Sequence, residues 1–257
     1  MNQSERRNYL IQKLLEEQPQ YAKMQIPGRC EEQKMLLRSL MNIRMPGKIN
    51  KEFQQIQDAY LAEENAAKGV VTPADMEELS PEIYLWKGDI TRLQVGAIVN
   101  AANSGMTGCY QPCHNCIDNC IHTYAGIELR NYCNELMLHQ GHEEPTGQAK
   151  ITPAFNLPCD YVIHTVGPIV RGRLTVEHER LLVSCYEACL RIAEENNIES
   201  IAFCCISTGV FMFPNERAAE LAVQTVKQYK DRTKSKIKVI FNVFKEEDER
   251  IYRGLLR

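Results

Sequence analysis

Strand-like and helix-like segments alternate along this chain from Glu82 to its C-terminus, and this alternation restricts the folds that the chain can adopt. Short apolar runs of the strand type occupy five segments: 83–86, 95–99, 161–166, 201–206 and 239–243. Apolar residues at helical spacing occupy four others: 117–138, 181–192, 218–226 and a short stretch near the C-terminus. Strands that alternate with helices predict an α/β fold with a largely parallel sheet that is covered on both faces.

The first 80 residues follow a different pattern. Apolar residues recur there at helical spacing in three segments, and Pro-Gly pairs at 27–28 and 46–47 separate these segments. We therefore expect three short helices and no strand in residues 1–80. The segment 66–73 is expected to be the linker to the rest of the chain.

Composition excludes several classes of function. The 257 residues include 30 Lys and Arg against 33 Asp and Glu, and the resulting net charge of −3 argues against a nucleic-acid-binding protein. No apolar stretch approaches the roughly 18 residues that a membrane span needs. Residues 1–10 lack the apolar segment of a signal peptide, so we expect a cytoplasmic protein. In that compartment, 11 cysteines indicate buried thiols and a metal site, not disulfides.

The densest group of metal-ligand residues lies in the segment 109–120, which contains four thiols and one imidazole. Such ligands suit zinc, and two thiolates with one imidazole and an open fourth position form a catalytic type of site. A closed, four-ligand structural zinc site and a set of packed thiols are the two alternatives that the residues leave open. Cys120 follows Cys116 by one helical turn, so it is either a ligand or the first core residue of a helix.

Two loops follow predicted strands where a parallel sheet binds ligands. The segment 100–105 (Asn-Ala-Ala-Asn-Ser-Gly) combines small residues with two carboxamides, so a ligand can approach its backbone. The segment 207–214 leads from a Ser-Thr-Gly turn into a helix expected to start near Pro214, whose first N–H groups can bind phosphate. Each loop alone also fits a tight turn without a ligand. Asp89 alone fits a helix N-cap.

The remaining histidine and cysteine candidates fall within apolar patterns. His164 lies inside a predicted strand, and we interpret it as a core histidine. Four cysteines occupy core positions of predicted helices and strands and are interpreted as small hydrophobic residues: Cys185, Cys189, Cys204 and Cys205.

Five motifs, taken in order along the chain, resemble the macrodomain family: Gly88–Thr91, Ala97–Asn103, Thr146–Ala149, Tyr161–Pro168 and Ile206–Phe211. The resemblance covers roughly residues 82–257. It implies a three-layer α/β/α fold with a mixed, largely parallel central sheet. It also implies ADP-ribose binding, and some macrodomains hydrolyse ADP-ribose from proteins.

One departure from the family pattern makes the resemblance more specific. Hydrolytic macrodomains usually carry a glycine run after the Asn-Ala-Ala-Asn loop, and residues 108–119 replace that run here. The replacement is similar to a microbial branch of macrodomains that depends on zinc and has a helical N-terminal extension. This resemblance implies that Cys109, His114 and Cys116 bind Zn²⁺ as an open site, which leaves no ligand role for the two other thiols of the segment.

The resemblance also implies roles in the ligand site. Asp118 takes the place of the catalytic aspartate, where it positions or deprotonates a water or a ribose hydroxyl, and Asn103 holds the distal ribose. Asp89 accepts a hydrogen bond from the adenine amino group, and the 207–211 loop holds the diphosphate. Phe213 packs against the distal ribose. The residues implied to bind ADP-ribose are Asp89, Ile90, Asn103, Asp118, Ser207, Thr208, Gly209, Val210, Phe211 and Phe213.

These roles predict a hydrolase that removes mono-ADP-ribose from modified proteins, with zinc at the distal ribose. The alternatives are a reader module that binds ADP-ribose without cleaving it, and a structural zinc module with a vestigial pocket. The branch is associated with sirtuin-type ADP-ribosyltransferases and lipoyl-carrier proteins, which implies a partner set. Residues 81–257 are expected to form the macrodomain, and residues 1–80 a helical extension that packs on it as a cap without a catalytic group.

Overall fold

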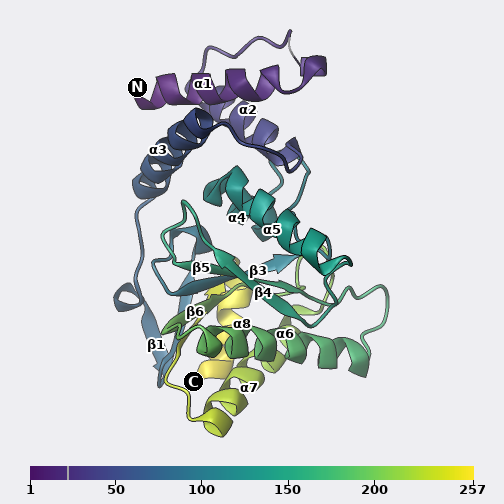
Figure 1. Ribbon diagram of the computed structural model, residues 1–257. Helices are drawn as coiled ribbons and strands as arrows, with labels where there is room; N and C mark the ends of the chain where they lie inside the picture. The colour runs from purple at the N-terminus through teal and green to yellow at the C-terminus, as the bar shows by residue number, and fades with distance from the viewer. Residues whose placement is uncertain (22) are drawn as a thin grey trace.

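A seven-stranded mixed sheet forms the centre of the computed structural model, which describes residues 1–21 and 23–257 (Figure 1). Its strand order is β1-β2-β7-β6-β3-β5-β4. The strands are β1 (Glu77–Ser80), β2 (Ile83–Lys87), β3 (Ala97–Ala102), β4 (Ala149–Pro153), β5 (Tyr161–Val166), β6 (Ser200–Phe203) and β7 (Lys238–Val243). The inner pairs are parallel, and the edge strands β1 and β4 run antiparallel to their neighbours. The predicted largely parallel sheet is therefore confirmed.

Helices cover both faces of the sheet (Figure 1). On one face α4 (Ile117–Ala125) contacts β3, and α5 (Ile127–Gln140) contacts β4. On the other face lie α6 (Val176–Glu195), α7 (Asn215–Thr233) and α8 (Glu246–Leu256). This arrangement confirms the three-layer α/β/α fold.

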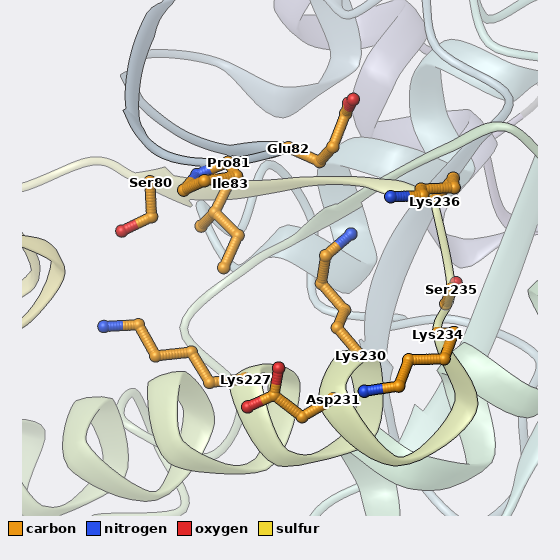
Figure 2. Close-up of a pocket in the computed structure, with 10 residues that line it drawn as sticks. All are labelled: Ser80, Pro81, Glu82, Ile83, Lys227, Lys230, Asp231, Lys234, Ser235 and Lys236. Atoms are coloured by element: carbon orange, nitrogen blue, oxygen red, sulfur yellow. The ribbon is translucent and has the colours of Figure 1, made fainter.

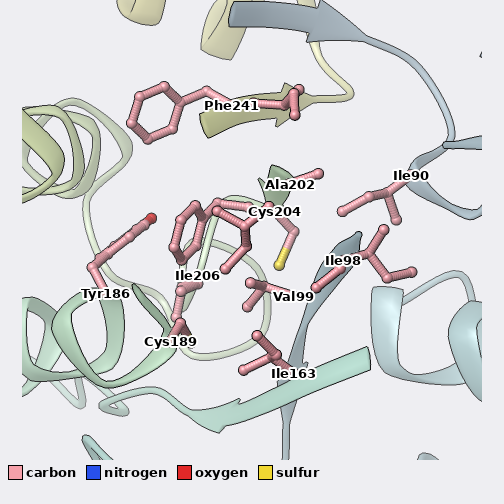
Figure 3. Packing of buried hydrophobic residues seen from close by; sticks show 14 of the residues in the cluster. Ile90, Ile98, Val99, Ile163, Tyr186, Cys189, Ala202, Cys204, Ile206 and Phe241 are labelled. Atoms are coloured by element: carbon pink, nitrogen blue, oxygen red, sulfur yellow. The ribbon is translucent and has the colours of Figure 1, made fainter. Parts of the chain in front are cut away.

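The core lies between the sheet and its helices, as Figure 3 shows. Successive residues such as Ile98 and Val99 point to opposite faces of a strand, and both are completely buried. This two-sided burial explains why the inner strands read as continuous apolar runs. Cys189 and Cys204 pack in the same core, as expected for small hydrophobic residues.

The N-terminal region forms three helices, as predicted: α1 (Gln3–Glu16), α2 (Cys30–Ile43) and α3 (Lys51–Ala67). Asn2 and Glu5 form a capping box at the start of α1, and Asn50 caps α3. The helices bury a second hydrophobic cluster of their own, to which the sheet-containing part contributes Ile127. Short 3₁₀ turns complete the described secondary structure: Pro19–Tyr21, Pro73–Asp75 and Ile90–Arg92. None of the helices in the described ranges has the length and apolar character of a membrane span.

Three elements differ from the sequence prediction. β1 lies within residues 1–80, where no strand was expected, and β4 was not predicted either. Both are edge strands with polar, partly exposed residues, so they lack the buried apolar run of an inner strand. The predicted helical segment 117–138 is divided at Gly126, which has a φ of +102°. A Cβ atom there would lie 2.8 Å from Nε2 of Gln57, so the break needs glycine.

Candidate active site

The loops singled out from the sequence meet at one edge of the sheet, because the inner strands are parallel and end there together. Asp89 follows β2, Asn103 follows β3, and Ser207 lies in the loop after β6. Segments that are more than a hundred residues apart in the sequence therefore form one site.

Asp118 is held at this edge by two carboxamides from the β3 segment. It lies in the first turn of α4 and is 5% exposed. Asn100 donates from Nδ2 to Oδ1 at 2.8 Å, and Asn103 donates from Nδ2 to Oδ2 at 3.2 Å. Burial raises the pKa of Asp118 to about 6, and the two amide hydrogen bonds act against that shift. The structure thus places Asn103 and Asp118 together, in an orientation that hydrogen bonds within the protein fix.

Two buried imidazoles lie behind Asp118. Nε2 of His122 is 3.6 Å from Oδ1 of Asp118, and Nδ1 of His164 is 3.1 Å from Nδ2 of Asn100. Burial lowers the pKa of His122 well below its usual value and that of His164 to about 3, so both rings are neutral. His164 also contacts Oγ1 of Thr152 at 3.0 Å, which confirms it as a hydrogen-bonded core histidine. With Cys133, the two histidines form a compact buried group.

Cys109, His114 and Cys116 form a second group of potential metal ligands, and Cys116 is the N-cap of α4, the helix that carries Asp118 in its first turn. Their ligand atoms all lie within 4.8 Å of one another, and Sγ of Cys109 is 3.7 Å from Nδ1 of His114. A tetrahedral zinc ion with bonds of about 2.0–2.3 Å holds its ligands about 3.3–3.8 Å apart, and the distance between Cys109 and His114 falls in this range. Burial raises the pKa of Cys116 to about 12, and a bound cation would offset that shift by stabilising the thiolate.

The two other thiols of the segment point away from this group. Sγ of Cys113 lies 3.2 Å from Oγ of Ser39 in α2. Sγ of Cys120 lies 3.6 Å from Nη2 of Arg38, in the same helix. Neither sulfur belongs to the metal-ligand group. The geometry therefore favours the open, three-ligand site over the closed one.

The loop 207–213 closes on itself. Phe213 donates its N–H to the carbonyl oxygen of Ser207 at 3.0 Å, and Met212 donates to that of Gly209 at 3.0 Å. Val210 is exposed at the tip of the loop, whereas Phe213 is 1% exposed and lies in the hydrophobic core. Phe213 therefore does not present its ring to a ligand, in contrast to the sequence expectation. The apolar ring is buried because the closed turn directs it inward, and α7 begins directly after Pro214, as predicted.

Asp89 serves as the N-cap of the 3₁₀ turn at Ile90–Arg92. Its Oδ1 accepts from the backbone N–H and the hydroxyl of Thr91, at 3.0 and 2.7 Å. Its Oδ2 lies 3.9 Å from Nζ of Lys68, a residue just beyond α3 whose pKa burial lowers to about 8. The side chain of Ile90 is buried, so only its backbone is available to a ligand.

Two hollows lie outside this loop edge. One of about 420 Å³ is at the opposite end of the strands, beside Ile83, and Figure 2 shows the lysines of α7 around it. Its position away from Asp118 excludes it as the active site. The other, of about 660 Å³, lies between α2, α3 and α4 and includes Cys113 and Asn115 in its lining.

Sequence reasoning missed His122 and the contact of Asn100 with Asp118, although each left a signal. His122 follows Asp118 by four residues, so it was bound to share its face of α4. Asn100 belongs to the Asn-Ala-Ala-Asn segment, but its inward orientation depends on the register of β3. That register could not be fixed from an apolar run alone.

The fold and these loops are those of a macro domain, and the chain belongs to this family. The Macro domain family matches residues 99–222. Two solved structures share the fold. The Oceanobacillus iheyensis macrodomain with ADP is 35% identical, with a TM-score of 0.62, and the match covers 70% of this chain and 93% of that one. The Trypanosoma brucei macrodomain in complex with ADP-ribose is 26% identical, with a TM-score of 0.67, over 86% and 95% of the two chains.

Within the family, the chain is similar over its whole length to a protein named "Protein-ADP-ribose hydrolase" from Treponema medium. The two are 57% identical over 260 residues, which cover 100% of each. A protein of the same name from Staphylococcus aureus (strain MRSA252) is 45% identical, over 96% of this chain and 94% of the relative. The match to the T. medium protein covers the whole chain and so includes the N-terminal helices, whereas the O. iheyensis macrodomain covers 70% of the chain.

Proposed function

We propose that this protein hydrolyses mono-ADP-ribose from modified proteins, with Zn²⁺ bound by Cys109, His114 and Cys116 at the distal ribose. The observation that carries the proposal is the position of Asp118: Asn103 holds it in the first turn of α4, and Cys116 of the ligand group is the N-cap of the same helix. The names of the full-length relatives support a hydrolase. A module that only binds ADP-ribose needs neither the aspartate nor the ligand group.

Different residues of the chain bind the ligand, orient the distal ribose and accept the proton. Asn103 and the 207–211 loop orient the distal ribose and the diphosphate, while Asp89 and the backbone of Ile90 hold the adenine. The bond between C1″ and the protein side chain breaks, and its electron pair leaves with that side chain. A water oxygen forms the new bond to C1″, and the proton of the water passes to the Asp118 carboxylate. Bound zinc would supply polarisation of a ribose hydroxyl or of the water.

A direct test is the incubation of an auto-modified, mono-ADP-ribosylated protein with this chain, with and without a metal chelator. Release of ADP-ribose that stops with the chelator and returns with added Zn²⁺ is the expected result. Release that is indifferent to chelation would remove zinc from the proposal and keep the hydrolase. Tight ADP-ribose binding without any release would establish the alternative, a reader module.

The substrate and the domain organisation are part of the same proposal. The resemblance to the zinc-dependent branch makes an ADP-ribosylated lipoyl-carrier protein the first substrate to test. We propose residues 81–257 as the macrodomain and residues 1–80 as its helical extension. The cytoplasmic location stays a prediction from the sequence.

A further inference from the structure

The segment 107–116 carries the proposed zinc ligands but contains no helix or strand of its own. Three ligands spread over eight positions need a fixed backbone, because zinc requires a defined geometry. The neighbouring element that can supply this support is α2, which packs against α4 beside the segment (Figure 1). The inference below rests on the proposed zinc site and concerns the residues of α2.

Arg38 of α2 holds the end of the segment that carries His114. Its Nη2 donates to the backbone carbonyl of His114 at 2.7 Å and to Oδ1 of Asn119 at 3.0 Å. Asn119 is completely buried and donates onward to the carbonyls of Cys109 and Gln111, at 3.3 and 2.9 Å. One guanidinium group therefore fixes the backbone at His114 and orients the amide that holds the backbone at Cys109.

Asn42, also in α2, holds the middle of the segment. Its Oδ1 accepts the backbone N–H of Cys113 at 2.9 Å, and its Nδ2 donates to Oγ1 of Thr123 in α4 at 2.9 Å. The Asn42 side chain thus bridges the segment and the helix that carries Asp118.

Arg130 of α5 joins the start of the segment to the C-terminal end of α2. Its Nε donates to the carbonyl of Thr107 at 2.7 Å, while its Nη1 donates to the carbonyls of Asn42 and Arg44 at 2.6 and 2.7 Å. The last carbonyls of a helix lack hydrogen-bond donors within that helix. The buried guanidinium group of Arg130 therefore donates hydrogen bonds both to the carbonyls at the end of α2 and to a carbonyl of the segment.

We propose that α2 is a positioning element of the metal site, with Arg38 and Asn42 as its positioning residues. Through them, the N-terminal helices set the spacing of Cys109, His114 and Cys116 without contributing a ligand. Substitution of a residue that orients the ligands of a metal typically lowers the affinity of the site for that metal by about 10- to 100-fold. A role of α2 in packing alone would leave that affinity unchanged.

The test compares Arg38→Met with Lys34→Met in the full-length protein. Both variants remove a cation from α2 and keep an apolar stem, but Lys34 pairs with Glu64 of α3 at 3.0 Å and not with the segment. Zinc affinity, measured by competition with a chromophoric chelator, is expected to fall about 10- to 100-fold in Arg38→Met and to stay unchanged in Lys34→Met. Arg38→Lys keeps one donor group and should recover part of the affinity.

Hydrogen exchange of the metal-free proteins gives a second readout, which does not depend on zinc. Arg38→Met should accelerate exchange at residues 109–120 and leave α1 and α3 protected. Wild-type zinc affinity in Arg38→Met, or faster exchange throughout α1–α3 instead of at 109–120, would overturn the proposal. A wild-type protein that binds no zinc would refute the metal site of the proposed function, and the exchange at 109–120 would still decide whether α2 positions the segment.

Discussion

Burial and hydrogen bonding shift the pKa of the Asp118 carboxyl group in opposite directions. Burial favours the neutral acid, whereas the amides of Asn100 and Asn103 favour the charged form and hold both oxygens in place. His122 and His164 stay neutral behind this group, so they add no charge to it. Contacts within the protein therefore orient the carboxylate, and orientation of the reacting groups is a general requirement for efficient catalysis.

Substitutions of Asp118 and Asp89 should have different effects: the first should lower the rate of turnover, and the second should weaken ADP-ribose binding. Asp118→Ala is expected to lower the single-turnover rate by about 100- to 10,000-fold and to retain most ADP-ribose affinity, since the group acts mainly in the transition state. Asp89→Ala should weaken ADP-ribose binding by about 10- to 100-fold, because an adenine contact is lost far from the reacting bond. Calorimetry and single-turnover assays measure the two effects.

A control is needed at Asp89 because its carboxylate also caps a 3₁₀ turn through Thr91. Asp89→Asn keeps an oxygen acceptor for the cap, so its fold should match the wild type. Equal losses of affinity and rate in both alanine variants would contradict the assigned roles.

At the scale of elements, the segment between β3 and α4 should divide its thiols into ligands and neighbours. Cys109→Ala and Cys116→Ala are expected to lose zinc, whereas Cys113→Ala and Cys120→Ala should keep about one zinc per chain. The reason is that the last two sulfurs face Ser39 and Arg38 of α2. Elemental analysis of the four purified variants measures this. Zinc loss in Cys113→Ala would indicate a closed, four-ligand site.

The start of α5 should make stability depend on pH. Burial raises the pKa of Glu128 to about 7, although Nε2 of Gln57 donates to its Oε2 at 2.6 Å. The folded protein therefore binds this proton more tightly than the unfolded chain does, and the contribution of Glu128 to stability falls as pH rises from about 5 through 7. Glu128→Gln should remove this contribution, so the stability of the variant relative to the wild type should rise between pH 5 and pH 8. Urea unfolding at pH 5 and pH 8 measures it.

Glu135→Gln is the control for that experiment, because Glu135 is an exposed residue of the same helix. The stability of Glu135→Gln should depend on pH in the same way as that of the wild type. A stability difference between Glu128→Gln and the wild type that is the same at pH 5 and pH 8 would contradict the role given to Glu128.

Inner and edge elements differed in how far the sequence predicted them. The inner strands were predictable because burial on both faces requires continuous apolar runs, as at Ile98 and Val99. The edge strands β1 and β4 have one exposed side and carry no such signal. The break at Gly126 depends on its contact with Gln57 of α3, a residue 69 positions earlier (126 − 57), so no local pattern indicated it.

The sequence predicted the types of residue in the site, but it did not predict the hydrogen bonds that hold those residues in place. The sequence pointed to the dense segment 109–120, and the resemblance to the zinc-dependent branch selected Cys109, His114 and Cys116 within it. The contacts from Arg38 and Asn42 join residues more than 70 positions apart, and hydrogen bonds of this kind follow only from tertiary packing. The burial of Phe213 likewise depends on how its loop closes.

At the scale of the whole molecule, the chain contains two hydrophobic clusters. The cluster around the sheet takes none of its buried residues from α1–α3 within the described ranges. The second cluster joins α1, α2 and α3, and Ile127 is its contact with the rest of the protein. Polar contacts add to this junction: Asn65 of α3 donates to the carbonyls of Tyr124 and Asn156, at 3.1 and 2.7 Å. The two parts therefore have separate cores and share polar contacts, which include those of Arg38 and Asn42 with the segment 107–116.

This division predicts the behaviour of a chain that begins at Val70. Such a chain keeps the bridge between Val71 and Leu93, all seven strands and the sheet-centred core, so it should fold cooperatively. It loses Arg38 and Asn42, and its zinc affinity is expected to fall by about 100-fold or more, since several positioning contacts are removed together. Circular dichroism, thermal unfolding and chelator competition measure these properties. A folded truncation with wild-type zinc affinity and turnover would show that the N-terminal helices are only a cap, as the sequence alone suggested.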